Sequence, residues 1–170
     1  MIGNSKIVAL CTARINDGTT QELVEELNRR LVAIGGRLLI YHLCSDYHWV
    51  EDYMNADSAI FDLIDYDTVD AVVLMDEKLK NKDVSKEILH KAKMHHIPAI
   101  TVDCSYENEV SLSFHFEKGF EEVVRHVIEF HQVKDVHFMA GYRDNEFSDQ
   151  RINVFKKCWQ KTIFRLRTIC

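Results

Sequence analysis

Short apolar runs, each followed by a longer stretch with helical periodicity, constrain this chain more than any other feature of its sequence. Four runs have the length of a strand and few polar interruptions: residues 6–11, 37–43, 69–75 and 97–102. Between them, apolar residues recur every three or four positions, as on one face of a helix. Apolar strands separated by helices predict a parallel sheet with helices on both faces, a doubly wound α/β fold.

The first helix has clear start and stop signals. Thr19 and Glu22 have the spacing of a capping box, leucines then recur on one helical face, and Gly35-Gly36 supplies the stop. The same alternation continues along the chain. We expect further helices near 56–65, 84–95, 117–130 and 148–157, a short extended stretch at 111–114 and a strand at 136–140.

Composition excludes several classes of function. With 170 residues, 46% of them hydrophobic, the chain can bury the core of one domain. A formal charge of -6 and the absence of a Lys/Arg block argue against direct contact with nucleic acid or an anionic membrane. The chain has neither a signal-peptide pattern nor an apolar run of about 18 residues, so we expect a cytoplasmic protein. Five scattered cysteines without a CxxC pair predict reduced thiols that fill the core.

The loop at 12–20 precedes a helix N-terminus, where backbone N–H groups can hold an anion such as a flavin phosphate. It lacks the glycine spacing of dinucleotide and phosphate-loop folds, so a capping role for Thr19 is favoured. Asp76 stands where a receiver domain carries its phosphorylated carboxylate. The acidic pair that such a domain needs after the first strand is here Cys11-Thr12, so we exclude a receiver.

Nine histidines raise the question of a metal site, and they are densest at His95-His96. Adjacent residues point about 100° apart on a helix and do not share a ligand. Solvated or capping histidines are therefore the favoured interpretation. No nucleophile elbow or Ser/His/Asp set is present. The sequence predicts no enzyme, no metal site and no cofactor.

In parallel sheets, ligands collect beyond the carboxyl ends of the strands. The polar residues at those ends are therefore the informative ones. They lie at 12–16, 44–46, 76–77, 103 and 141–144.

Several stretches together resemble the sensor domain of the LacI type, which has the periplasmic-binding-protein-like fold. Residues 69–75 (VDAVVLM) are similar to the family's VDGIIL strand, and residues 96–103 (HIPAITVD) resemble its GIPVVxID. Residues 116–141 resemble its acidic residue, glycine, helix ending in HLI and strand ending in a small residue and glycine. Ten residues later, Arg151 occupies the position of an arginine that reaches the effector in this family. The glycine usual three residues after it is here Val154.

The resemblance implies that residues 1–157 form the N-terminal lobe of such a sensor, with a flavodoxin-like strand order. A family sensor holds a small molecule, often a sugar, between two hinged lobes, and closure is the signal. Polar residues at strand ends are also ordinary in surface loops. The resemblance nevertheless implies five ligand-binding residues: Arg14, Asn16, Asp76, Asp103 and Arg151.

The segment at 46–65 also looks like the sensor lobe found ahead of GGDEF diguanylate cyclase domains. The parent protein would then act in signal transduction or in transcription regulation. A homodimer is expected, because a single lobe exposes surfaces that should be buried. The alternative is a flavodoxin-like protein that binds a flavin over the loops after the first two strands, with Tyr47 or Trp49 stacked on the ring.

The last 13 residues, 158–170, have three basic and no acidic side chains, unlike the acidic chain before them. Suitable codons read in a shifted frame spell LAENDIPFEDDM, which is what a LacI-type lobe would have next. We hypothesise a one-base deletion near Lys156-Lys157 that makes 158–170 a frameshifted tail.

Overall fold

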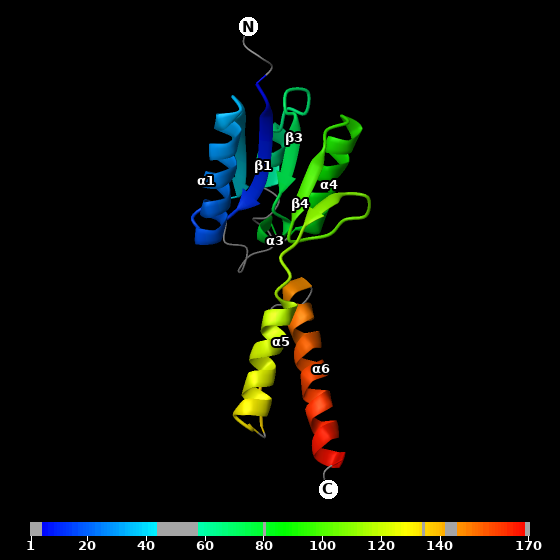
Figure 1. The fold of residues 1–170 in the computed structure, drawn as a ribbon. Coiled ribbons are helices and arrows are strands. Elements are labelled where there is room, and N and C mark those ends of the chain that lie inside the picture. The colour runs from blue at the N-terminus through cyan, green and yellow to red at the C-terminus, as the bar shows by residue number, and fades with distance from the viewer. Residues whose placement is uncertain (1–4, 44–57, 80, 134, 142–145, 169–170) are drawn as a thin grey trace. The chain divides into compact units, whose positions relative to one another are not determined.

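A computed structural model describes residues 5–43, 58–79, 81–133, 135–141 and 146–168, and the loop at 44–46 that the sequence singled out lies outside them. The chain forms two compact units, Met1–Ser113 and Phe114–Cys170 (Figure 1). The first unit holds the sheet, and the described part of the second unit is mainly helical.

The first unit is built on a five-stranded sheet in the order β2-β1-β3-β4-β5, in which every neighbouring pair is parallel. This confirms the doubly wound fold and the flavodoxin-like strand order that the sequence predicts. The strands are β1 (Ile7–Ala13), β2 (Arg37–Leu43), β3 (Ala71–Leu74), β4 (Ala99–Val102) and β5 (Val110–Leu112).

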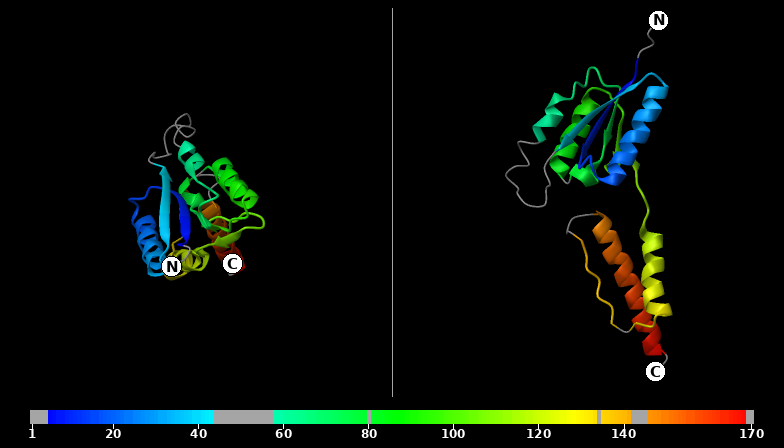
Figure 2. Two further views of the ribbon diagram at one scale, coloured as in Figure 1. Left: turned by 90° about the horizontal axis from the view of Figure 1, so that it is seen from above. Right: turned by 90° about the vertical axis from the view of Figure 1, so that its left-hand side faces the viewer.

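Helices cover both faces of this sheet, as Figure 2 shows. Successive side chains of a strand point to opposite faces, so β1 supplies both cores. Ala9, Cys11 and Ala13 pack on one face with Phe61 of the 3-10 helix η2 and Ile88 of α4. The bounds of these helices are η2 (Ala59–Leu63), α3 (Asp76–Leu79) and α4 (Lys82–Met94). The helix predicted near 56–65 is a five-residue 3-10 helix, η2, in its described part.

The opposite face is covered by α1 (Gly18–Ala33). Leu10 of β1 packs there with Met75 and Val102, and Leu23 and Val24 of α1 lie against this cluster. Removal of this apolar surface from water is the main driving force for seating α1 on the sheet.

The two ends of α1 show where the capping signals hold and where they fail. The helix begins at Gly18 with Asp17 as its N-cap, so the predicted capping role of Thr19 is wrong. The predicted stop is confirmed. Gly35 has a φ of 74°, and the N–H groups of Gly35 and Gly36 donate to the carbonyls of Val32 and Leu31, the pattern of a Schellman motif.

The histidine pair at the end of α4 has a structural role. His95 is the C-cap of the helix, its ring lies stacked on Tyr66, and its Nδ1 is 3.0 Å from Asp67 Oδ1. The interpretation of His95 as a capping residue is confirmed. At the other end of α4, the Asn81 side chain accepts hydrogen bonds from two backbone N–H groups of the first turn.

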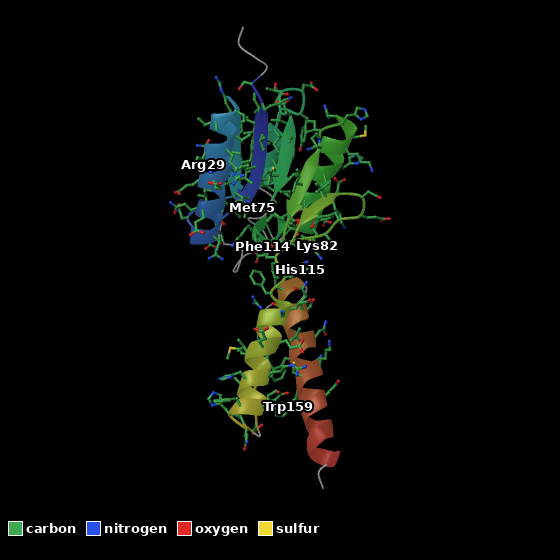
Figure 3. All side chains as sticks on the ribbon, viewed as in Figure 1. Arg29, Met75, Lys82, Phe114, His115 and Trp159 are labelled. Atoms are coloured by element: carbon green, nitrogen blue, oxygen red, sulfur yellow. The ribbon has the colours of Figure 1, made fainter. Side chains whose placement is uncertain are left out.

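The second unit is formed by α5 (Glu117–Arg125), the π-helical turn η3 (His126–Phe130) and α6 (Glu146–Thr168). Its small core contains Val124, Ile128 and Cys158, with Phe155 and Trp159 packed against it (Trp159 is labelled in Figure 3). Helix α6 runs past Lys157 without a break. No described helix has the length and apolar character to cross a membrane.

The prediction of a strand at 136–140 is wrong, because these residues have no regular secondary structure. A strand needs a neighbour to satisfy its backbone groups, and the described part of the second unit contains no strand that could pair with it. The segment is held by aromatic contacts instead. The Phe138 ring lies 5.5 Å from Phe120 and 5.2 Å from Phe155, centroid to centroid.

Candidate functional site

The carboxyl ends of β1, β3 and β4 meet at one edge of the sheet. Cys11 is paired with Leu74, and Leu74 is paired with Thr101. Asp76 and Asp103 each follow their strand's paired residue by two positions, so they stand at the same level of this edge. Met75, at the same end of β3, is labelled in Figure 3. The register therefore gathers four of the five predicted ligand residues at one edge: Arg14, Asn16, Asp76 and Asp103.

Two of these residues have a backbone conformation that residues other than glycine rarely adopt. Arg14 directly follows β1 with a φ of 54°, and Asp103 directly follows β4 with a φ of 62°. The left-handed region costs a residue with a Cβ about 1–2 kcal/mol. Asp103 is held in it by β5, because its N–H donates to the Leu112 carbonyl at 2.8 Å. Strained non-glycine residues of this kind cluster at ligand sites.

Asp76 is the most buried residue of the set, with 5% of its surface exposed. The Tyr106 hydroxyl donates to Asp76 Oδ1 at 2.6 Å. Burial, and then this hydrogen bond, raise the pKa of Tyr106 above its usual range, so the phenol remains protonated and acts as the donor. Tyr106 thus holds the Asp76 carboxylate in one orientation below the edge.

An ion pair ties the start of α1 to α3 at the same edge. Lys78 Nζ lies 2.7 Å from Asp17 Oδ2, and both side chains are partly buried. The hydrogen bond from Lys78 lowers the pKa of Asp17, so this carboxylate is ionised at neutral pH. In the loop between β1 and α1, the N–H of Asp17 donates to the Arg14 carbonyl at 2.9 Å. This hydrogen bond closes a tight turn in which Asn16 is exposed to solvent.

The thiol beneath this edge is not a nucleophile. Cys11 is completely buried, and burial raises the pKa of its thiol to about 12. The thiolate is the nucleophile, and a buried thiol with so high a pKa forms almost none of it at neutral pH. The interpretation of Cys11 as a small apolar core residue is confirmed, while Cys44 lies outside the described residues.

Arg151 lies on α6 in the second unit, where it is exposed. It is therefore not part of the set that the sheet register assembles. The aromatic residues of the flavin alternative, Tyr47 and Trp49, lie outside the described residues.

Sequence reasoning missed three residues of this edge: Asp17, Lys78 and Tyr106. Tyr106 belongs to the loop between β4 and β5, which the sequence gives only as a connection. A large aromatic residue in a strand-end loop was the available signal, because such a ring is rarely left in solvent without a partner.

A separate hollow of about 50 Å³ lies between η2 and α4. Ligand sites usually enclose about 300–1,000 Å³, so this hollow accepts guests of the size of water only. Its polar side includes Lys91, which is paired with both Asp62 and Glu87. We do not assign a ligand to it.

No protein-family model matches this chain, and no curated protein matches it either. Solved structures do match. The lac repressor dimer bound to operator and the anti-inducer ONPF superposes with a TM-score of 0.65 at 15% identity, over 92% of this chain and 51% of that one. A LacI family transcriptional regulator from Weissella paramesenteroides with bound glucose gives 0.66 at 18%, over 92% and 54%.

A third match is an ABC sugar transporter subunit from Rhodobacter sphaeroides, with a TM-score of 0.68 at 14% identity, over 92% of this chain and 53% of that one. The chain spans about half the length of each of these proteins. Likeness at this level of identity establishes the architecture alone. The parallel sheet and its flanking helices have the periplasmic-binding-protein-like fold of LacI-type regulators and sugar-binding proteins.

Proposed function

We propose that this chain is a ligand-sensing lobe of a bacterial LacI-type regulator and that it binds a small polyhydroxylated effector at the carboxyl edge of its sheet. The observation that carries this proposal is the pair of left-handed residues, Arg14 and Asp103, at the ends of β1 and β4. In open parallel sheets this is the edge where ligands bind. Sugars are named as bound in three of the matching structures: glucose, D-xylulofuranose and sucrose.

The side chains of this edge suit hydroxyl groups, which both donate and accept hydrogen bonds. The Arg14 guanidinium offers a rigid fork of donors, and the Asn16 amide offers both a donor and an acceptor. The carboxylates of Asp103 and Asp76 can accept hydrogen bonds from hydroxyl groups. Arg151, from the second unit, is proposed as a fifth ligand residue on the family resemblance alone.

The proposed role is binding, not catalysis. A sensor needs only a ligand that has different affinities for two conformations, so that binding shifts their populations. We place this sensor in the cytoplasm, where a regulator of transcription or of a GGDEF output domain would act. A homodimer is part of the proposal, and the matching lac repressor structures are dimers.

Isothermal titration of the full chain with a panel of neutral sugars, including glucose, sucrose and D-xylulose, tests the binding function. For any sugar that binds, Asn16→Ala should weaken affinity up to about tenfold, the loss of one or two neutral hydrogen bonds. Asn28→Ala, an exposed amide on α1, is the matched control and should have no effect. Equal losses in both variants, or no binding to any sugar, would contradict the proposal.

The flavin alternative has a direct test. Protein purified without added cofactor should be colourless if it is a sugar sensor. Visible absorption bands of flavin, with bound flavin in stoichiometric amount, would favour the flavodoxin-like protein instead.

The frameshift origin of residues 158–170 is a separate proposal, as is the lobe boundary at 157. Cys158 is buried in the small core of the second unit, so the first residues of this segment contribute to packing. Sequencing the source gene decides the question. We expect codons for a continuing lobe in another frame after Lys157, and an intact frame through Cys170 would remove the idea.

A further inference from the structure

The end of α5 carries a pair of histidines that its π-helical turn brings together. The turn η3 spans His126–Phe130, and the N–H of His131 donates to the His126 carbonyl at 3.3 Å, an i→i+5 hydrogen bond. In an α-helix, residues five apart point about 140° away from each other, given roughly 100° per residue. The wider π turn stacks them on one face instead. The backbone hydrogen bond of the π turn and the contact between the two imidazoles therefore involve the same two residues, His126 and His131.

The Nε2 atoms of the two imidazoles are within hydrogen-bonding distance, and the ring planes are 87° apart. His126 Nε2 and His131 Nε2 lie 3.1 Å apart, and both residues are exposed to solvent. Phe130 packs against both rings. It stacks on His126 with a centroid distance of 4.8 Å and a plane angle of 13°, and it meets the edge of His131 at 5.2 Å. The rings are thus held by a neighbour before any ligand arrives, which lowers the cost of ordering them.

This spacing matches two ligands on one metal ion. Imidazole nitrogens coordinate zinc at about 2.0–2.1 Å, which puts two of them about 2.8–3.4 Å apart at octahedral or tetrahedral angles. Imidazole is a preferred ligand of zinc, nickel and copper ions, while magnesium prefers oxygen. We propose that His126 and His131 chelate a divalent transition-metal ion through their Nε2 atoms.

The coordination sphere of this ion would be completed from solvent. The described residues contain no group of three or more His, Cys, Asp or Glu side chains arranged to hold a metal. Two protein ligands give an open, exchangeable site, unlike the four ligands of a structural zinc site. The proposal is independent of sugar binding, because it uses neither the sheet nor its edge.

Calorimetric titration of the full chain with NiCl2 and with ZnSO4 tests the site. MgCl2 is the control, because magnesium should not bind there. Either His126→Gln or His131→Gln should weaken nickel binding by about a hundredfold, because the second imidazole acts as an intramolecular ligand. His90→Gln on α4 and His137→Gln in the second unit are matched exposed histidines, and each should leave the affinity unchanged.

Phe130→Ala separates a positioned pair from two independent histidines. It removes no ligand, so it should weaken nickel binding by less than either histidine variant while circular dichroism stays unchanged. The proposal is overturned if the unmodified chain binds nickel no more tightly than the single His126 or His131 variants. It is also overturned if the His90 or His137 variant loses as much affinity as they do.

Discussion

The Tyr106 hydroxyl donates a 2.6 Å hydrogen bond to Oδ1 of Asp76, a carboxylate with 5% of its surface exposed. The bond links the loop after β4 to the end of β3, across the edge proposed to bind ligand. It also satisfies one oxygen of a buried carboxyl group, which would be costly to leave without a hydrogen-bond partner.

Tyr106→Phe should therefore lower the free energy of unfolding by about 1–3 kcal/mol, the cost of removing one partner from a buried polar group. Tyr66→Phe is the matched control. The Tyr66 hydroxyl is buried and has no hydrogen-bond partner among the described residues, so its removal should be neutral or stabilising. Urea denaturation measures both variants. A Tyr106 variant as stable as the Tyr66 variant would show that the bond to Asp76 contributes nothing.

The left-handed conformation of Arg14 predicts a conflict between stability and binding. Arg14→Gly removes the steric cost of a Cβ at a φ of 54° and should raise the unfolding free energy by up to about 1 kcal/mol. The same change removes the guanidinium and should abolish measurable sugar binding. Gln132→Gly, with a φ of 50° in the second unit, should share the gain in stability and leave sugar binding intact. Thermal unfolding and calorimetry together check this pair.

Much of the fold could be predicted because periodicity reports burial directly. The runs at 6–11 and 69–75 fall on β1 and β3, where apolar residues on both faces are partly or fully buried because helices cover both sides of the sheet (Figure 2). The error at 136–140 has the opposite cause. The alternation of Val136, Phe138 and Ala140 gives the right period for a strand, but no period says whether a partner strand exists.

The candidate site could be predicted only as an edge. The sequence places Asp76 and Asp103 just after two predicted strands. Because neighbouring parallel strands end at the same edge of a sheet, both residues were expected at that edge. The partner of Asp76, thirty residues away, depends on how one loop folds back, and no local pattern encodes that. The pair His126 and His131 was missed for a related reason. Their separation of five matches no α-helical face, so only the π turn reveals it.

The two glycines after α1 should respond differently to the same substitution. A Cβ on Gly36 would lie 2.9 Å from the Lys6 carbonyl oxygen and 3.1 Å from that of Leu31, so backbone must move. Such overpacking costs about 1–3 kcal/mol. A Cβ on Gly35 meets open space, and Gly35→Ala should cost only the strain of its positive φ, about 1 kcal/mol. Urea denaturation ranks the variants, and a larger loss at Gly35 would mean that the end of α1 is packed differently.

The ion pair between Asp17 and Lys78 predicts how acid affects stability. The Lys78 hydrogen bond lowers the pKa of Asp17 in the folded protein, whereas the pKa of an aspartate in an unfolded chain is about 3.9. A lowered folded pKa stabilises the fold above the unfolded value, and this contribution is lost as the pH falls through the folded one. Lys78→Met should therefore reduce the melting temperature at pH 7 and flatten its fall between about pH 5 and pH 2.

Lys82→Met, an exposed lysine at the start of α4, removes the same charge without this partner and should leave the acid-induced fall as steep as in the unmodified chain. Melting temperatures across this range, followed by circular dichroism, distinguish the two variants. If the melting temperatures of both lysine variants fall equally steeply with acid, Lys78 does not set the pKa of Asp17.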